Sequence, residues 1–259
     1  HGDGTNGAQN NTFLDSSTNN FSITRNGNTT QGSFSPYGFN WSNYFGGIAA
    51  NDNLIAVSAN TANAMGTGDW TAEAWIFLTV GGLTPFVVDT LPTTSGSTTG
   101  LRMRLNASNQ LQLWQYSSAV LTSSASISVA TWTHVALVKS SGTTTAYING
   151  TSSGTYSDSG NYTCGTNRPM IGSDGYNNGS DNTFTGYISN LRLVKGTAVY
   201  TGNFTPSTTP LTAITNTSLL ACQSNRFKDN SSNNFTLTAN GTPSVQRFNP
   251  FGTSTAYST

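Results

Sequence analysis

The chain has 259 residues, enough for one large β-sandwich, and a second full domain is not expected at this length. Only 8% of the residues are charged, and ten Lys and Arg side chains balance ten Asp and Glu side chains. Because the sequence has no basic cluster and no apolar run of roughly 20 residues, we predict neither nucleic-acid binding nor membrane insertion.

A repeated unit stands at both ends of the chain. Residues 11–38 and 225–252 align without gaps at an offset of 214, and 13 of the 28 positions are identical. Each copy runs Asp-x-Ser-x-Asn-Asn-Phe, then a β-prone stretch, then aromatic-x-Pro-aromatic-Gly, which predicts a strand, a turn and a second strand. Either both copies are edge elements of one sandwich, or the parent protein is a tandem array and this chain holds one module and the opening of the next. We favour the array, because repeats at a fixed period are typical of arrays.

Between the two copies the apolar residues follow a period of two, as expected of strands with one buried face. Leu101, Met103 and Leu105 alternate with polar residues, and Leu111 and Leu113 follow after a turn, which predicts a hairpin. Further strands are predicted at residues 69–78, 85–89, 132–139, 143–150, 169–173 and 184–194. Many short strands between Gly, Asn, Ser and Thr turns predict an all-β, two-sheet antiparallel sandwich.

Four segments in order carry a family resemblance: residues 15–20, 68–78, 130–151 and 167–196. They include Asp-Ser-Ser-x-Asn-Asn, Trp-x-His-Val-Ala followed by Tyr-x-Asn-Gly, and Ile-Gly followed by Phe-x-Gly-Tyr-Ile-x-x-Leu-Arg. As a set they resemble the laminin-G-like branch of the concanavalin A-like lectin/glucanase superfamily. The resemblance implies a concanavalin A-like jelly roll with a calcium or glycan site in edge loops. The Asn-rich style and the repeated unit are also similar to repeat-bearing structural proteins of marine bacteriophages.

The predicted organisation has two parts. Residues 1–215 form the laminin-G-like sandwich, and residues 216–259 supply closing strands and the second copy of the repeat. That second copy either packs on the same sandwich or opens a next module.

Catalysis is not expected. Glycoside hydrolases generally need two carboxylates flanking the scissile bond, and the only glutamate is Glu73, with Asp69 as its sole acidic neighbour within fifteen residues. We interpret Glu73 as a structural residue of its strand. His134 lies in the Trp-x-His-Val-Ala strand without a nucleophile motif, so we interpret it as a hydrogen-bonded structural histidine.

The remaining aromatic and sulfur side chains are interpreted mostly as structural. Trp75 and Trp132 occupy strand positions and are expected in the core, where tryptophan buries a large apolar area. Cys164 and Cys222 either pair in an oxidising setting or are two separately buried thiols, because connectivity does not follow from sequence.

Two sets of residues are candidates for ligand binding. Calcium prefers carboxylate and amide oxygens, which makes two pairs candidate metal ligands, Asp174 with Asp181 and Asp3 with Asp15. For Asp15 and its counterpart Asp229 we favour the alternative that they bond their own backbone as Asx turns. Sugar sites combine aromatic platforms with polar groups. The candidate sugar-binding residues are Trp114, Tyr116, Tyr176, Asn177 and Asn178.

These patterns predict a non-catalytic module of an extracellular or virion surface. Its predicted activity is recognition of a glycan or host surface, with calcium as a candidate cofactor. The alternative is a purely structural subunit or decoration protein of a virion or filament, which assembles with copies of itself or neighbouring modules through sandwich edges.

Overall fold

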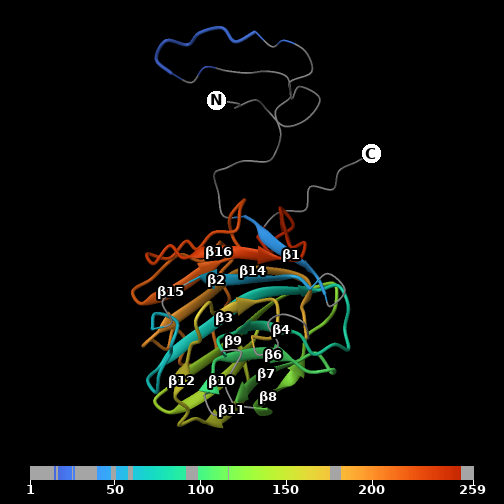
Figure 1. Ribbon diagram of the computed structural model, residues 1–259, viewed down its shortest axis with the longest axis vertical. Coiled ribbons are helices and arrows are strands. Elements are labelled where there is room, and N and C mark those ends of the chain that lie inside the picture. Colours follow the sequence, from blue (N-terminus) through green and yellow to red (C-terminus); the bar gives the residue numbers. More distant parts are fainter. Residues whose placement is uncertain are drawn as a thin grey trace. The chain divides into compact units, whose positions relative to one another are not determined.

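A computed structural model describes Asp15, Asn26 and residues 17–24, 40–47, 51–57, 61–91, 99–115, 117–175 and 182–251. The chain divides into two compact units, His1–Gly38 and Phe39–Thr259. The second unit contains all the labelled strands, which run as two large sheets (Figure 1). No helix occurs in the described ranges, and none there is available to cross a membrane.

The larger sheet has eight strands. In spatial order they are β11 (Thr151–Ser157), β10 (Thr143–Ile148), β9 (Trp132–Ser140), β3 (Trp70–Leu78), β14 (Thr185–Lys195), β1 (Ser42–Gly46) and β17 (Ser244–Gln246), with β15 (Thr217–Ala221) also paired to β14.

The other large sheet has seven strands. In spatial order they are β16 (Thr236–Asn240), β2 (Asn53–Val57), β13 (Met170–Ile171), β4 (Phe86–Asp89), β6 (Arg102–Leu105), β7 (Gln110–Gln115) and β8 (Ser118–Ser126). A short parallel pair, β5 (Thr99–Gly100) and β12 (Tyr162–Thr163), lies apart from both sheets. Every strand pair within the two large sheets is antiparallel, which confirms the predicted two-sheet antiparallel sandwich.

The core lies between the sheets and follows the alternation of the strands. In the predicted hairpin, Met103 and Leu105 of β6 face Leu111 and Leu113 of β7 within one apolar cluster, which confirms that hairpin. Trp70 from β3 packs edge-on against Tyr162 with ring centroids 5.3 Å apart. Each such side chain stabilises the fold by about 1.5–3 kcal/mol when removed from water.

The prediction that Trp75 and Trp132 belong to this core is wrong. In β3 the alternate residues Trp70, Ala72 and Ala74 point inward, so Trp75 projects from the opposite, outer face of the sheet. Both indoles are half-buried there, whereas Trp70 is fully buried.

The second copy of the repeat is built into the edges of the sandwich. Its strand β16 pairs with β2, and its strand β17 pairs with β1. The strands on either side of the predicted boundary at residue 215, β14 and β15, also pair with each other. Whether a further module follows stays a prediction.

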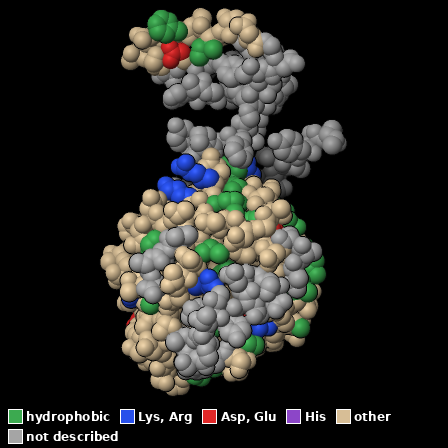
Figure 2. Space-filling view, in the orientation of Figure 1, with side chains coloured by type: hydrophobic (Ala, Val, Ile, Leu, Met, Phe, Trp, Pro, Cys, Tyr) green, Lys and Arg blue, Asp and Glu red, His purple; other side chains and the backbone are tan. Residues whose placement is uncertain are grey.

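The sparse charge and the two cysteines of the sequence can both be located in the structure. Charged side chains are sparse among the described residues on the face seen in Figure 2. Cys164 and Cys222 are both buried free thiols, and burial raises the pKa of Cys164 to about 12. The structure therefore contains two separately buried thiols and not a disulfide between Cys164 and Cys222.

Candidate functional site

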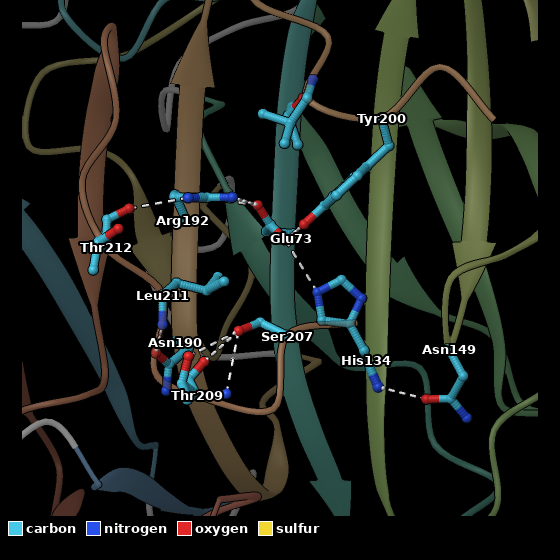
Figure 3. A network of polar contacts seen from close by, with 12 residues as sticks. Glu73, His134, Asn149, Asn190, Arg192, Tyr200, Ser207, Thr209, Leu211 and Thr212 are labelled. Carbon is cyan, nitrogen blue, oxygen red and sulfur yellow. Dashed lines mark hydrogen bonds and ion pairs between the residues drawn. The ribbon is translucent and has the colours of Figure 1, made fainter. Parts of the chain in front are cut away.

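The outer face of β3 carries the sole glutamate, Glu73, which is completely buried. Antiparallel pairing sets Arg192 of β14 directly opposite Glu73. The Arg192 guanidinium donates to Oε1 of Glu73 from Nε at 2.8 Å and from Nη2 at 2.5 Å. Oε2 lies 3.0 Å from Nε2 of His134 and accepts a 2.8 Å hydrogen bond from the Tyr200 hydroxyl. Figure 3 shows the arginine, histidine and tyrosine converging on this carboxylate from three sides.

The segment of residues 197–214, which we call the covering segment, lies over this face and supplies Tyr200. Its backbone is tied to the sheet at several points. Val199 N donates to Thr71 Oγ1 at 2.9 Å, and the same hydroxyl donates to the carbonyl of Thr197 at 3.0 Å. Arg192 Nη1 donates to the carbonyl of Thr212 at 3.0 Å. One arginine thus links the buried carboxylate to the covering segment.

The β10–β11 hairpin holds the covering segment from the other side. Phe204 N donates to the carbonyl of Gly150 at 2.9 Å, and a Cβ at position 150 would overlap the carbonyl of Phe204. Gly150 also has a φ of +77°, a conformation that L side chains rarely adopt. Both the close approach of Phe204 and the backbone conformation therefore require glycine at this position. The ring of Phe204 stacks on Tyr200 with centroids 3.5 Å apart. This stack orients the Tyr200 hydroxyl toward Glu73.

The charges of this network are mutually compensated. Burial by itself would raise the pKa of Glu73, but the His134 hydrogen bond and the Arg192 charge more than offset burial, and the pKa lies below its usual value. Burial, together with the negative charge of Glu73, raises the pKa of Tyr200. The carboxylate is therefore ionised at neutral pH and the tyrosine remains a hydrogen-bond donor to it.

A pocket of about 400 Å³ opens beside this network. It is lined by Trp75, Asn149, Pro206, Ser207, Thr208, Pro250 and Phe251. The Trp75 indole meets the Phe251 ring edge-on at 5.9 Å and the His134 ring at 5.3 Å. Two buried nitrogen atoms nearby, Trp75 Nε1 and His134 Nδ1, have no hydrogen-bond partner among the described residues.

The lining of this pocket favours an uncharged ligand. None of its seven residues carries an ionisable side chain. The rings of Trp75 and Phe251 offer apolar faces, while Asn149, Ser207 and Thr208 offer amide and hydroxyl groups. Such a mixture, in a concave site of 300–1,000 Å³, is typical of small-molecule binding sites.

The outer face of the seven-stranded sheet contains a second buried polar cluster. Arg102 Nε donates to Asp89 at 2.9 Å and Arg102 Nη2 donates to Asp174 at 3.0 Å. The guanidinium of Arg104 lies 4.1 Å from the ring centroid of Trp114, and the indole N–H of Trp114 donates to Gln112 at 2.9 Å. In this cluster the polar side chains form ion pairs and hydrogen bonds with one another.

The structure places two of the predicted site residues in this cluster, Trp114 and Asp174. Trp114 is half-buried, and Asp174 is bonded to an arginine, which commits one of its carboxylate oxygens. Asp3, Tyr116, Tyr176, Asn177, Asn178 and Asp181 lie outside the described residues. Within the described ranges no group of three or more His, Cys, Asp or Glu side chains is arranged to hold a metal ion. The metal and sugar assignments of these residues stay predictions.

Sequence reasoning did not find the residues of the pocket. Trp75 was placed in the core, although the alternation of β3 assigns it to the opposite face from Trp70. That parity was readable from the sequence. Ser207, Thr208 and Phe251 carry no comparable signal, because they reach the pocket through irregular segments. The expectation for His134, a hydrogen-bonded histidine, is confirmed.

Comparison with known proteins assigns the family. A laminin G type family model, described as Concanavalin A-like lectin/glucanases superfamily, matches residues 47–199, more than half of the chain. The chain belongs to this superfamily. Among curated proteins none matches.

Solved structures of the same superfamily fold are similar to the chain at low identity. One is a protein of Bacteroides ovatus named as a candidate carbohydrate-binding protein, with a TM-score of 0.57 and 16% identity over 88% of this chain and 66% of its own. Another is the heptameric SAP-like pentraxin of Limulus polyphemus, with a TM-score of 0.53 and 15% identity over 80% of this chain and 94% of its own. The chain spans just under two thirds of the first structure's length. At such identities the likeness concerns the fold.

Proposed function

We propose that the chain is a non-catalytic carbohydrate-binding or adhesive module, and that the pocket beside Trp75 holds the sugar. The observation that carries the proposal is the combination of an aromatic wall with hydroxyl and amide groups and no ionisable lining residue. A sugar ring matches it, because it has an apolar C–H face for the indole and hydroxyls for polar side chains. The B. ovatus relative named as a candidate carbohydrate-binding protein supports the choice of ligand class.

The buried state of Glu73 supports a non-catalytic role. Hydrolysis of a glycosidic bond generally needs a carboxyl that protonates the leaving group and a second that attacks or activates water. Both oxygens of Glu73 are hydrogen-bonded and its side chain is 0% exposed. The carboxylates of Asp89 and Asp174 in the described cluster are bonded to Arg102.

Calcium dependence, an extracellular or virion surface location and the similarity to phage structural proteins remain predictions. A structural role through sandwich edges remains the alternative function. Chelation provides a direct test of the metal: a glycan array is probed with the full chain with and without EDTA, and binding that EDTA abolishes indicates calcium.

The pocket is tested by comparing two tryptophans on the same array. Trp75→Ala is expected to weaken glycan binding roughly tenfold or more, corresponding to about 1.4 kcal/mol, because it removes the aromatic ring face from the pocket wall. Trp114→Ala is the comparison variant, because the sequence also predicted Trp114 as a sugar-binding residue; if the sugar lies beside Trp75, this variant binds as the unaltered chain does. If Trp75→Ala remains folded by circular dichroism and binds glycans normally, the sugar is not in this pocket. Absence of any glycan binding contradicts the proposed function itself.

A further inference from the structure

The second copy of the repeat closes one side of the sandwich. Its strands extend both sheets, β16 along β2 and β17 along β1. Leu237 of β16 is 8% exposed and belongs to the main core, and Phe235 packs against that core. Phe248 follows β17 and contacts Phe77 and Tyr187 on the outer face of the eight-stranded sheet, with centroid distances of 4.8 Å and 4.9 Å. We call residues 225–251 the closing element.

A turn around Asp229 anchors the closing element to β15. Its Oδ1 accepts a 3.0 Å hydrogen bond from Leu220 N, and Asn230 N donates to the carbonyl of Leu220 at 2.7 Å. Asn233 Nδ2 donates to the carbonyl of Ser218 at 2.9 Å. The Asp229 side chain is completely buried by this docking.

The first copy of the repeat has the same turn. Ser17 N and Ser17 Oγ both donate to the Asp15 carboxylate at 2.9 Å, and Phe21 N donates to it at 2.8 Å. In the second copy the matching bonds of Ser231 and Phe235 to Asp229 measure 2.8 Å, 2.8 Å and 3.0 Å. The Asx turns predicted at both aspartates are thereby confirmed.

The backbone of the two turns also agrees. Asn20 has a φ of +45°, and its counterpart Asn234 has a φ of +47°. The first copy therefore forms the same turn through hydrogen bonds among its own residues. A turn that is already formed loses less conformational entropy when it docks.

The two copies differ in what covers them. Phe21 is 68% exposed and Ile23 is 47% exposed. Their counterparts are Phe235, which is half-buried against the core, and Leu237, which is 8% exposed. The first copy therefore exposes apolar side chains at the two positions that the second copy uses for packing against the core.

The sequence similarity between the copies is concentrated in the turn and the strand that follows it. Five positions there are identical or exchanged between Leu and Ile: Asp15, Ser17, Asn19, Phe21 and Ile23 match Asp229, Ser231, Asn233, Phe235 and Leu237. All three residues of β17 differ from the first copy. The first copy has thus kept the residues that dock on β15 and pack on the core beside β2.

We propose that residues 15–26 form a second docking segment, equivalent to residues 229–240 of the closing element, which binds a neighbouring copy of this sandwich along β15 and β2 in place of that copy's own residues 229–240. The occupant is a copy of the same chain because the contacts are those the fold already uses. Replacement of one copy of the segment by the other creates an interface that reuses existing contacts, as in domain swapping. The chains are linked head to tail: each donates its first copy and receives a neighbour's first copy along the edge that its own second copy leaves.

A register-specific cross-link tests this docking in the full chain. Thr24 aligns with Thr238, which is the strand partner of Ile55. A donor chain carries Thr24→Cys, and an acceptor chain carries Ile55→Cys with Asp229→Ala, which loosens its own closing element. The native thiols are both buried. After mixing and oxidation, non-reducing electrophoresis and peptide mass spectrometry measure the disulfide between positions 24 and 55.

The control donor carries Asn26→Cys instead, because Asn26 aligns with Asn240, the partner of Asn53. Its diagonal separation from position 55 is about 7–8 Å, beyond the usual disulfide range of about 4.4–6.8 Å. The proposal expects the Thr24→Cys donor to cross-link about tenfold more than this control, given the narrow geometry of a disulfide. Equal yields overturn it.

A replacement chain decides the matter if Asp229→Ala prevents folding. Residues 229–240 are replaced by the sequence of residues 15–26, so that the first copy must dock on β15 and pair with β2. The chain is expected to keep its strand content by circular dichroism and a Tm within about 10 °C of the unaltered chain, where about 2–4 °C corresponds to each kcal/mol for a domain of this size. A replacement chain that does not fold overturns the proposal.

Discussion

The outer faces of the two sheets both carry a buried arginine, a buried carboxylate and a tryptophan, yet the surroundings of the two clusters differ. On the seven-stranded sheet, Arg102 joins Asp89 and Asp174, and the Trp114 indole donates to Gln112. On the eight-stranded sheet, Glu73 is equally saturated, but the cluster borders an open pocket, and the indole N–H of Trp75 has no partner among the described residues.

This difference separates a polar cluster that supports the fold from one that also borders a binding site. An unpaired indole N–H does not by itself mark a binding site, because Trp70 in the core and Trp132 also have unpaired indole nitrogens among the described residues. Aromatic and charged residues alone do not distinguish the two faces either. The contrast therefore depends on the pocket that borders the Glu73 cluster, and the following substitutions are ordered by their expected effect on it.

The largest effect is expected for Glu73→Ala. The change leaves Arg192, His134 and Tyr200 buried without their shared acceptor, which is expected to lower the free energy of unfolding by about 3–5 kcal/mol. Urea denaturation followed by tryptophan fluorescence measures it. The control is Asp69→Ala at the start of the same strand, where the carboxylate accepts one hydrogen bond from Ser141 N. Equal effects of the two substitutions contradict the assigned role of Glu73.

Trp114→Ala is expected to lower the free energy of unfolding by about 2 kcal/mol, because it removes a half-buried indole together with its cation–π contact to Arg104. Glycan binding is expected to remain unchanged, as measured by isothermal titration calorimetry. The opposite result, normal stability with lost glycan binding, would place the ligand on the seven-stranded sheet and not in the pocket beside Trp75.

Tyr200→Phe removes one hydrogen bond to the Glu73 carboxylate and keeps the ring stacked on Phe204. We expect a loss of about 1.5 kcal/mol in the free energy of unfolding, the lower end of the usual range for a bond to a charged group, because Arg192 and His134 still bind the carboxylate. Tyr147→Phe is the control, since Tyr147 packs on the same Phe204 ring with centroids 5.4 Å apart. A change no larger than that of the control shows that the hydroxyl is dispensable.

The smallest effect concerns pH. The pKa of Glu73 is lower in the folded chain than the ordinary glutamate value of about 4.5, so its charge stabilises the fold fully above about pH 4.5, and that contribution is lost as the pH falls through the folded pKa. The Tm difference between the unaltered chain and Glu73→Gln is therefore expected to shrink below that pH. Differential scanning calorimetry between pH 3 and pH 7, roughly the range over which carboxylates titrate, measures it, and a difference that widens on acidification contradicts the assignment.

Much of the fold was predictable because strand alternation is local. The period of two located the hairpin of Met103 and Leu113 and the strands that became β3, β9, β10 and β14. The same alternation would have placed Trp75 on the outer face. What sequence did not reveal is which strands lie side by side, because the pairing of Glu73 with Arg192 joins residues 119 positions apart.

The candidate site was less predictable than the fold. The pocket wall comes from three irregular segments, those of Asn149, Ser207 and Phe251, which no period identifies. The repeated unit also shows which features the sequence could and could not predict. Its Asx turns follow from Asp15 and Asp229 alone, because the hydrogen bonds are local. Their burial depends on what each copy docks against, and two matching sequences therefore have different environments.

The sandwich also has a mechanical property, set by the place where its chain enters and leaves. Asn249 Nδ2 donates to the carbonyl of Asn40 at 2.9 Å, and Ser42 faces Gln246 across the β1–β17 pair. A force that pulls these two points apart loads the bonds of β1 and β17 one after another, as in opening a zipper, and not all together in shear. Under tension the β1–β17 edge is therefore the weak point of the sandwich, because its few hydrogen bonds are broken singly.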